Sequence, residues 1–183
     1  MRQILLGVLI LGLTACRSVD DGFVRLFAPR KVSAIQIVQR TTHFGSGGRT
    51  FSLGAALKRE GAEYVCDASK TTGVLLFSDL APSTSSLSPE AVDKAFQLLA
   101  AAPVKKEVYQ PHIAMTDYYP YARIALTLPD GEILFESWSQ GDTRVPWGVI
   151  IDGGQYVSSS EDIAEAMRLL MTDNHCLFRR RMG

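Results

Sequence analysis

The sequence predicts a single α+β domain with a mostly antiparallel sheet and two or three helices. Three observations lead to this fold class. About seven short β-rich runs are separated by turn-forming residues, and two pairs of these runs flank the tight-turn signals Pro129-Asp130-Gly131 and Asp152-Gly153-Gly154. Two further segments carry apolar residues at helical spacing. Strands joined by short turns pair antiparallel, so helices and hairpins together indicate an α+β architecture.

The first half begins with a predicted strand over Val32–Arg40, in which isoleucines alternate with glutamines. Residues 52–58 have their leucines on one side at helical spacing, and the pattern favours a short helix ended by Gly61. A short strand is expected over Glu63–Asp67. The continuous apolar run Gly73–Phe77 is typical of a central strand that is buried on both faces.

Two helices have clear sequence signals. The first starts at Ser88-Pro89-Glu90, where an N-cap residue precedes a proline and an acid, and it ends before Pro103. The second follows Ser159, which with Asp162 resembles a shortened capping arrangement. The apolar positions of both helices follow the i, i+3, i+4, i+7 spacing of a buried face: Val92, Ala95, Phe96 and Leu99 in the first, and Ile163, Ala166, Met167 and Leu170 in the second.

Two hairpins account for the second half of the chain. The strands Tyr121–Leu128 and Glu132–Trp138 form the first hairpin. The strands Trp147–Ile151 and Gln155–Val157 form the second.

The N-terminus carries an export signal. A basic start, the apolar run Ile4–Leu13 and small residues before a cleavage point are typical of a secretory signal, whereas a membrane-spanning helix needs about 20 apolar residues. The ending Leu13-Thr14-Ala15-Cys16 resembles the lipobox of bacterial lipoproteins. This resemblance implies cleavage before Cys16 and acylation of that cysteine, for which palmitate is a typical chain, and two or more chains anchor a protein stably. An uncleaved anchor and ordinary secretion are the alternatives.

The export signal divides the chain into a signal peptide (1–15), a lipidated N-terminus and tether (16–31) and the single α+β domain (32–183). Arg17 follows the cysteine, and by resemblance to enteric lipoproteins, in which Asp at this position is associated with inner-membrane retention, the protein is expected at the outer membrane, facing the periplasm.

The composition excludes one class of partner. The chain has 19 basic and 19 acidic residues, and cleavage would remove only Arg2, which leaves a mature net charge of −1. A nucleic-acid-binding domain would need a marked basic excess, so we expect no nucleic-acid partner. With 46% hydrophobic residues the domain can bury a core, and we expect it to fold without a metal or cofactor.

The chain has three cysteines. With Cys16 acylated, Cys66 and Cys176 remain as a pair in an oxidising compartment, which predicts a disulfide bond. The alternatives are two unpaired thiols or a catalytic pair formed by Cys176 and His175.

Catalytic candidates are sparse. His43 adjoins a glycine-rich segment whose backbone N–H groups suit an anion or an oxyanion, although a plain connecting loop has the same composition. His43, His112 and His175 are far apart in sequence and lack the ligand spacing of zinc sites, so we expect no metal.

Aromatic residues gather in and beside the hairpins. Tyr and Trp are common at protein interfaces, and they are equally common as partly buried sheet residues. The candidate binding surface comprises Tyr118, Tyr119, Tyr121, Trp138 and Trp147. The tail Arg179–Arg181 is expected to be a solvated, frayed terminus, with a membrane contact as the alternative.

These patterns favour a membrane-anchored envelope lipoprotein whose periplasmic domain is a non-catalytic protein-binding module of inhibitor, immunity or assembly-accessory type. The acylated Cys16 would contact the membrane, and another envelope protein would be the partner. The alternative is a small envelope hydrolase that uses His43 or His112.

Overall fold

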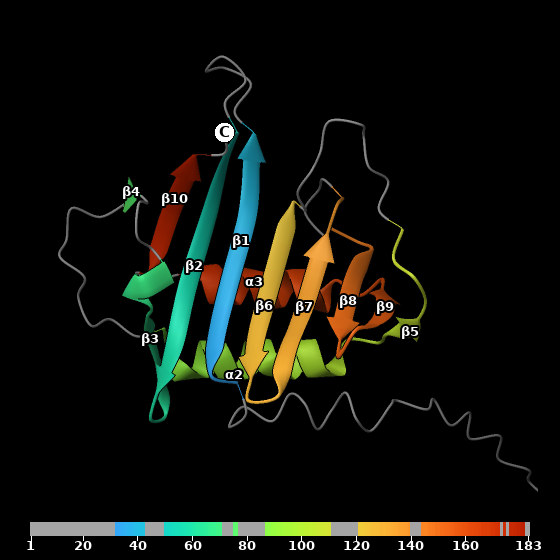
Figure 1. Ribbon diagram of the computed structural model, residues 1–183, viewed down its shortest axis with the longest axis horizontal. Helices are drawn as coiled ribbons and strands as arrows, with labels where there is room; N and C mark the ends of the chain where they lie inside the picture. Colours follow the sequence, from blue (N-terminus) through green and yellow to red (C-terminus); the bar gives the residue numbers. More distant parts are fainter. Residues whose placement is uncertain are drawn as a thin grey trace, which may run out of the picture.

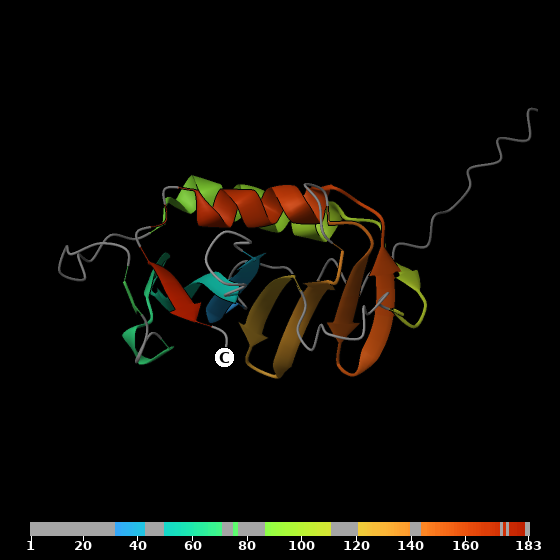
Figure 2. The same cartoon turned by 90° about the horizontal axis from the view of Figure 1, so that it is seen from above.

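The computed structural model describes residues 32–42, 50–70, 75–76, 87–110, 121–139, 144–172, 174 and 176–181. These residues form two layers. A ten-stranded sheet makes one layer, and two α-helices lie side by side on one of its faces (Figures 1 and 2).

Every strand pairing in the sheet is antiparallel. The order is β4-β10-β2-β1-β6-β7-β8-β9-β5, and β3 pairs with β2 outside this path. The strands are β1 (Ala34–Thr42), β2 (Thr50–Glu60), β3 (Glu63–Cys66), β4 (Leu75–Leu76), β5 (Lys105–Lys106), β6 (Ala122–Leu128), β7 (Gly131–Ser137), β8 (Trp147–Ile151), β9 (Gly154–Ser158) and β10 (Leu177–Arg181). The predicted α+β fold with its mostly antiparallel sheet is confirmed, as are both hairpins and the strands at β1 and β3.

The helices are α2 (Pro89–Ala101) and α3 (Asp162–Met171), and a 3-10 turn, η2, covers Ala68–Lys70. Both predicted apolar faces are buried against the sheet. The start signals work differently from what we predicted. The hydroxyl of Ser88 donates to the Glu90 carboxylate and does not cap the helix backbone, although Ser88 is the N-cap residue. At α3 it is Ser160, not Ser159, whose hydroxyl accepts the N–H of Asp162, at 3.1 Å.

The core lies between the helices and the strand residues that face them. Cross-strand register aligns these residues in rows, as in Leu57, Ile35, Leu126, Ile133 and Ile151 across five strands. The aromatic rings of Tyr64 and Phe96 meet edge to face with their centroids 6.1 Å apart. The Tyr64 hydroxyl donates to the carbonyl oxygen of Val32 at 2.8 Å, which satisfies a polar group inside the core.

The predicted helix over residues 52–58 is wrong, because this segment belongs to β2. Pairing with β1 on one side and β10 on the other supplies the backbone hydrogen bonds of an extended chain. The misleading pattern arose because small residues such as Ala56 are buried on the face away from the helices, while Leu57 is buried on the helix face. A strand that is buried on both faces resembles a helix in its apolar spacing.

Two further expectations are corrected at the far end of the sheet. The run at residues 73–77 was predicted as a central strand, but its described part, β4, pairs with β10 at the end of the strand order. The tail Arg179–Arg181 was predicted as a frayed terminus, but its backbone lies in β10, between β2 and β4. Pairing with a distant strand orders this segment.

The predicted disulfide bond is confirmed. Cys66 and Cys176 are bonded across 110 residues, with their Cα atoms 5.2 Å apart. The neighbouring Asn174 is buried, where its side-chain amide donates to Leu170 O at 2.7 Å and its Oδ1 accepts the N–H of Cys176 at 2.9 Å. The bond and this asparagine together fix the connection from α3 to β10.

Candidate functional site

The face of the sheet opposite α2 and α3 is the candidate site, and Figure 1 is viewed onto it, with the helices behind the strands. We call it the open face, because neither described helix lies on it. Strand alternation places on it the residues that alternate with the core positions. Among them are Val38, Arg40, Tyr121, Arg123, Leu134, Glu136, Trp138, Ile150 and Val157.

Arg40 and Tyr121 form the first contact on the open face. The guanidinium carbon of Arg40 lies 5.1 Å from the centroid of the Tyr121 ring, within the range of a cation–π interaction. The backbone N–H of Arg40 donates to Tyr121 O at 2.8 Å. Backbone and side chain together therefore hold this cation beside an aromatic ring.

Arg123 and Glu136 form the second contact, as directly opposite residues of β6 and β7. Arg123 Nε lies 3.3 Å from Glu136 Oε1, with 40% and 21% of the two side chains exposed. The Nε atom itself is buried and makes no hydrogen bond within the described chain, so the contact is an ion pair without hydrogen-bond geometry. The exposure of Arg123 comes from other atoms of its side chain.

Tyr109 lies in the segment that follows β5 and contacts residues at one end of the open face. Its hydroxyl accepts the N–H of Trp138 at 3.1 Å and donates to Pro146 O at 3.3 Å. Its ring rests on Gly148 of β8. Burial raises the pKa of Tyr109, and the hydrogen bond from Trp138 opposes this rise, so the phenol is neutral at physiological pH.

Aliphatic side chains fill the middle of the open face. Val38, Leu134, Ile150 and Val157 are half-buried. They are absent from the described hydrophobic residues that form or pack against the core, as expected for positions on the other side of the sheet. Val38 lies directly opposite Arg123, and Leu134 lies directly opposite Ile150 on the neighbouring strands, so apolar surface adjoins the charged pair.

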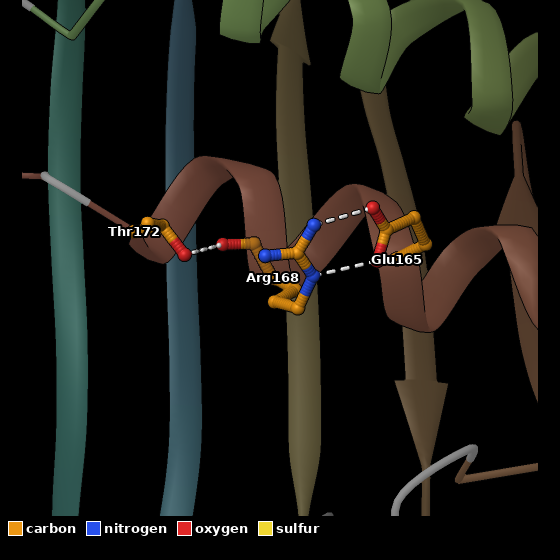
Figure 3. A network of polar contacts seen from close by, with 3 residues as sticks. All are labelled: Glu165, Arg168 and Thr172. Atoms are coloured by element: carbon orange, nitrogen blue, oxygen red, sulfur yellow. Dashed lines mark hydrogen bonds and ion pairs between the residues drawn. The ribbon is translucent and has the colours of Figure 1, made fainter.

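The helix layer holds an arginine of a different kind (Figure 3). Arg168 donates two hydrogen bonds to Glu165, at 2.7 and 2.6 Å, and its carbonyl oxygen accepts the Thr172 hydroxyl at 2.8 Å. The hydrogen bonds from Arg168 lower the pKa of the Glu165 carboxyl. Arg168 is thus a satisfied surface arginine and serves as a matched reference for Arg123.

The structure brings together only part of the predicted binding surface. Tyr121 and Trp138 are half-buried at one end of the open face. Trp147 is fully buried and belongs to the core, so its placement on a binding surface is wrong. The reason is register, because Trp147 pairs with the buried Ser158 on the helix face. Tyr118 and Tyr119 lie outside the described residues.

Sequence reasoning missed Tyr109, Arg40, Arg123 and Glu136. A signal existed for the pair of Arg123 and Glu136, because both lie equally far from the turn between β6 and β7, and a tight turn fixes hairpin register. No local pattern indicated that Tyr109 would pack against Gly148.

The proposed catalytic histidines, His43, His112 and His175, all lie outside the described residues, as does Cys16. Within the described ranges no three His, Cys, Asp or Glu side chains are grouped as metal ligands would be. In the same ranges neither helix is both long and apolar enough to cross a membrane. Comparisons of the chain with protein-family models, curated proteins and solved structures found no match.

Proposed function

We propose that this chain is a lipid-anchored envelope protein whose domain binds another envelope protein through the open face, as an inhibitor, an immunity protein or an assembly accessory. The lipobox-like Leu13-Thr14-Ala15-Cys16 supports the anchor. Arg17 supports a position at the outer membrane, facing the periplasm.

The composition of the open face carries the proposal. Tyr, Trp and Arg supply much of the binding energy of protein interfaces when the partner covers them and excludes water. Tyr121, Trp138 and Arg123 share this face with half-buried aliphatic residues, of which Val38 lies directly opposite Arg123. The helix layer instead carries short-range pairs such as Arg168 with Glu165, which are already satisfied.

The tether matches an anchored binding module. Residues 16–31 would separate the lipids from the domain, and a flexible chain of this length has a root-mean-square span of roughly 20–25 Å. The domain would therefore stay close to the membrane surface and meet partners that are integral to the envelope or bound to it. This proximity raises the effective concentration of such partners.

Two measurements test this function. Mass spectrometry of the mature N-terminus should find an acylated Cys16, and a different start would contradict the anchor. Affinity capture from envelope extracts should recover a discrete protein with the wild type and with Arg168→Ala, but far less of it with Trp138→Ala. Equal capture by Trp138→Ala, with the fold intact, would argue against the open face. Catalytic turnover of an envelope substrate that is lost in His43→Ala or His112→Ala would favour a hydrolase instead.

A further inference from the structure

We propose that an apolar segment of the tether, residues 23–27, docks on the open face over Leu134 and Ile150 and covers that part of the face until the partner protein displaces it. The segment lies outside the described residues. Its composition, its reach and the charges near its point of entry support the docking. The proposal rests on the proposed function, because the displacing protein is the partner that binds the open face.

The composition of the segment does not suit a plain linker. Its sequence is Phe23-Val24-Arg25-Leu26-Phe27, so four of its five residues are large and apolar. Segments that stay solvated are poor in aromatic and β-branched residues. We therefore expect the segment to bury its apolar side chains against another surface.

The chain enters the domain at a fixed point. Val32 is fully buried, and its carbonyl oxygen accepts the Tyr64 hydroxyl at 2.8 Å. The N–H of Ser33 donates to Thr127 O, near the end of β6, also at 2.8 Å. The segment is therefore tied to the end of the sheet that holds the turn between β6 and β7 (Figure 1).

Aliphatic side chains of the open face are within reach of this point. Leu134 and Ile150 lie directly opposite each other on β7 and β8. The register places them roughly 10–15 Å across the sheet and about 14 Å along it from Val32. Phe27 lies five residues before Val32 and Phe23 nine, which allow spans of up to about 18 Å and about 32 Å. Phe27 can therefore reach Leu134, and Phe23 can reach both side chains.

The charges near the entry point complement the segment. Glu132 lies two residues before Leu134 on the same face of β7, and its side chain is exposed. Within the described part of the chain it takes part in no ion pair. Asp130, in the turn before β7, is exposed as well. A segment docked at Leu134 brings Arg25, at its centre, close to these two carboxylates.

The short connection makes even weak docking effective. Four residues separate Phe27 from Val32, and a short linker gives a local concentration on the order of millimolar. A contact that is weak between separate molecules is then enough to hold the segment in place. Trp138 lies four residues beyond Leu134, so it remains for the first contact with the partner, which displaces the segment as it covers more of the face.

Photo-crosslinking of the mature lipoprotein in lipid nanodiscs tests the docking without the partner. The crosslinker p-benzoylphenylalanine replaces Phe27, or Val19 of the same tether as the control, and mass spectrometry locates the adducts. We expect an intramolecular adduct on β7 or β8 from position 27, at least about fivefold more abundant than from position 19. Adducts mainly on α2 or α3, on lipid, or between two copies would overturn the proposal in favour of the helix layer, the membrane or a second copy.

Methyl NMR of the same protein gives an independent readout. Ile150 lies on the open face, whereas Ile133 is buried on the helix face and serves as the reference. Phe23→Leu/Phe27→Leu keeps the segment apolar but removes both rings. We expect this variant to move the Ile150 methyl signal by more than its linewidth and to leave the Ile133 signal in place. An unmoved Ile150 signal would contradict the docking.

Capture experiments separate this proposal from the function on which it rests. Phe23→Ser/Phe27→Ser should strengthen capture of the envelope partner at least about threefold, while Val19→Ser leaves it unchanged. Weaker capture by the double variant would overturn displacement, because the segment would then contribute to binding. If Trp138→Ala abolishes capture but the segment neither crosslinks to the sheet nor affects Ile150, the binding face stands and the docking falls. If the segment crosslinks to β7 or β8 but no envelope protein is captured, the docking stands and the proposed function falls.

Discussion

The ring of Tyr109 lies directly on the backbone of Gly148, so closely that a β carbon at position 148 would lie 2.6 Å from Cδ1 of that ring. Glycine is therefore required here for close approach and not for turn formation. The contact brings the segment after β5 onto the open face and places the Tyr109 hydroxyl between Trp138 and Pro146.

Gly148→Ala should displace this tyrosine. The added methyl group overlaps the ring, and overpacking of this kind typically costs about 1–3 kcal/mol of unfolding free energy. We expect a lower denaturation midpoint and weaker partner binding, because Trp138 loses its hydrogen bond. Tyr109→Phe is the control, since it removes the hydroxyl but keeps the ring on Gly148. A Gly148→Ala variant as stable as the wild type would show that Tyr109 does not pack there in solution.

The two tryptophans should respond differently to truncation. Trp147 is fully buried, so Trp147→Ala should lower the unfolding free energy by about 3–5 kcal/mol. Trp138 is half-buried on the open face, and Trp138→Ala should cost clearly less stability while weakening partner binding by about 2 kcal/mol or more. Urea denaturation followed by circular dichroism compares them, and equal destabilisation would place Trp138 in the core.

The hairpins show how far local sequence can predict this fold. Tight turns at Pro129–Gly131 and Asp152–Gly154 fix both strand pairs, and the helices were found from apolar spacing and start signals because both are local. Pairing between distant strands produces no comparable signal in the local sequence. β10 pairs with β2, which lies more than 120 residues earlier in the chain. The local sequence therefore could not predict that the C-terminal arginines form a strand or that residues 52–58 are extended.

The binding surface was only partly predictable, because the local sequence does not show which face of the sheet a strand residue occupies. Tryptophan is common both in interfaces and in cores, so the residue type of Trp147 did not decide between them. Its strand has apolar residues on both faces, so alternation could not show which face Trp147 occupies. The pairing of β8 with β7 and β9 decides that Trp147 faces the helices.

Removing the disulfide bond should destabilise the domain without changing its open face. The bond closes a loop of 110 residues, and the Cys66→Ala/Cys176→Ala variant should lose about 2–5 kcal/mol of unfolding free energy, because the unfolded chain gains freedom. Thermal melts with and without reductant measure the loss. Alkylation of the unreduced, denatured wild type should label neither cysteine, and labelling of both would contradict the bond.

Tyr64 should make stability fall at high pH. Burial raises the pKa of this phenol from 10.0 to about 12, so folding favours its neutral form. The preference for the neutral phenol adds about 2–3 kcal/mol to the unfolding free energy. This stabilisation is complete below pH 10 and is lost as the pH rises towards 12. Between pH 9 and 11 the unfolding free energy of the wild type should fall by about 1 kcal/mol more than that of Tyr64→Phe. Parallel urea titrations at the two pH values provide the comparison, and an identical pH dependence of both proteins would contradict it.

We propose that the open face, and not the helix layer, contacts the partner in the envelope. The most direct measurement is photo-crosslinking in intact cells, with p-benzoylphenylalanine placed at Trp138 on the open face or at Arg168 on the helix layer. We predict a discrete protein adduct from position 138 and none from position 168. An adduct from position 168 alone, or no protein adduct from position 138 in a correctly folded and anchored variant, would contradict the account.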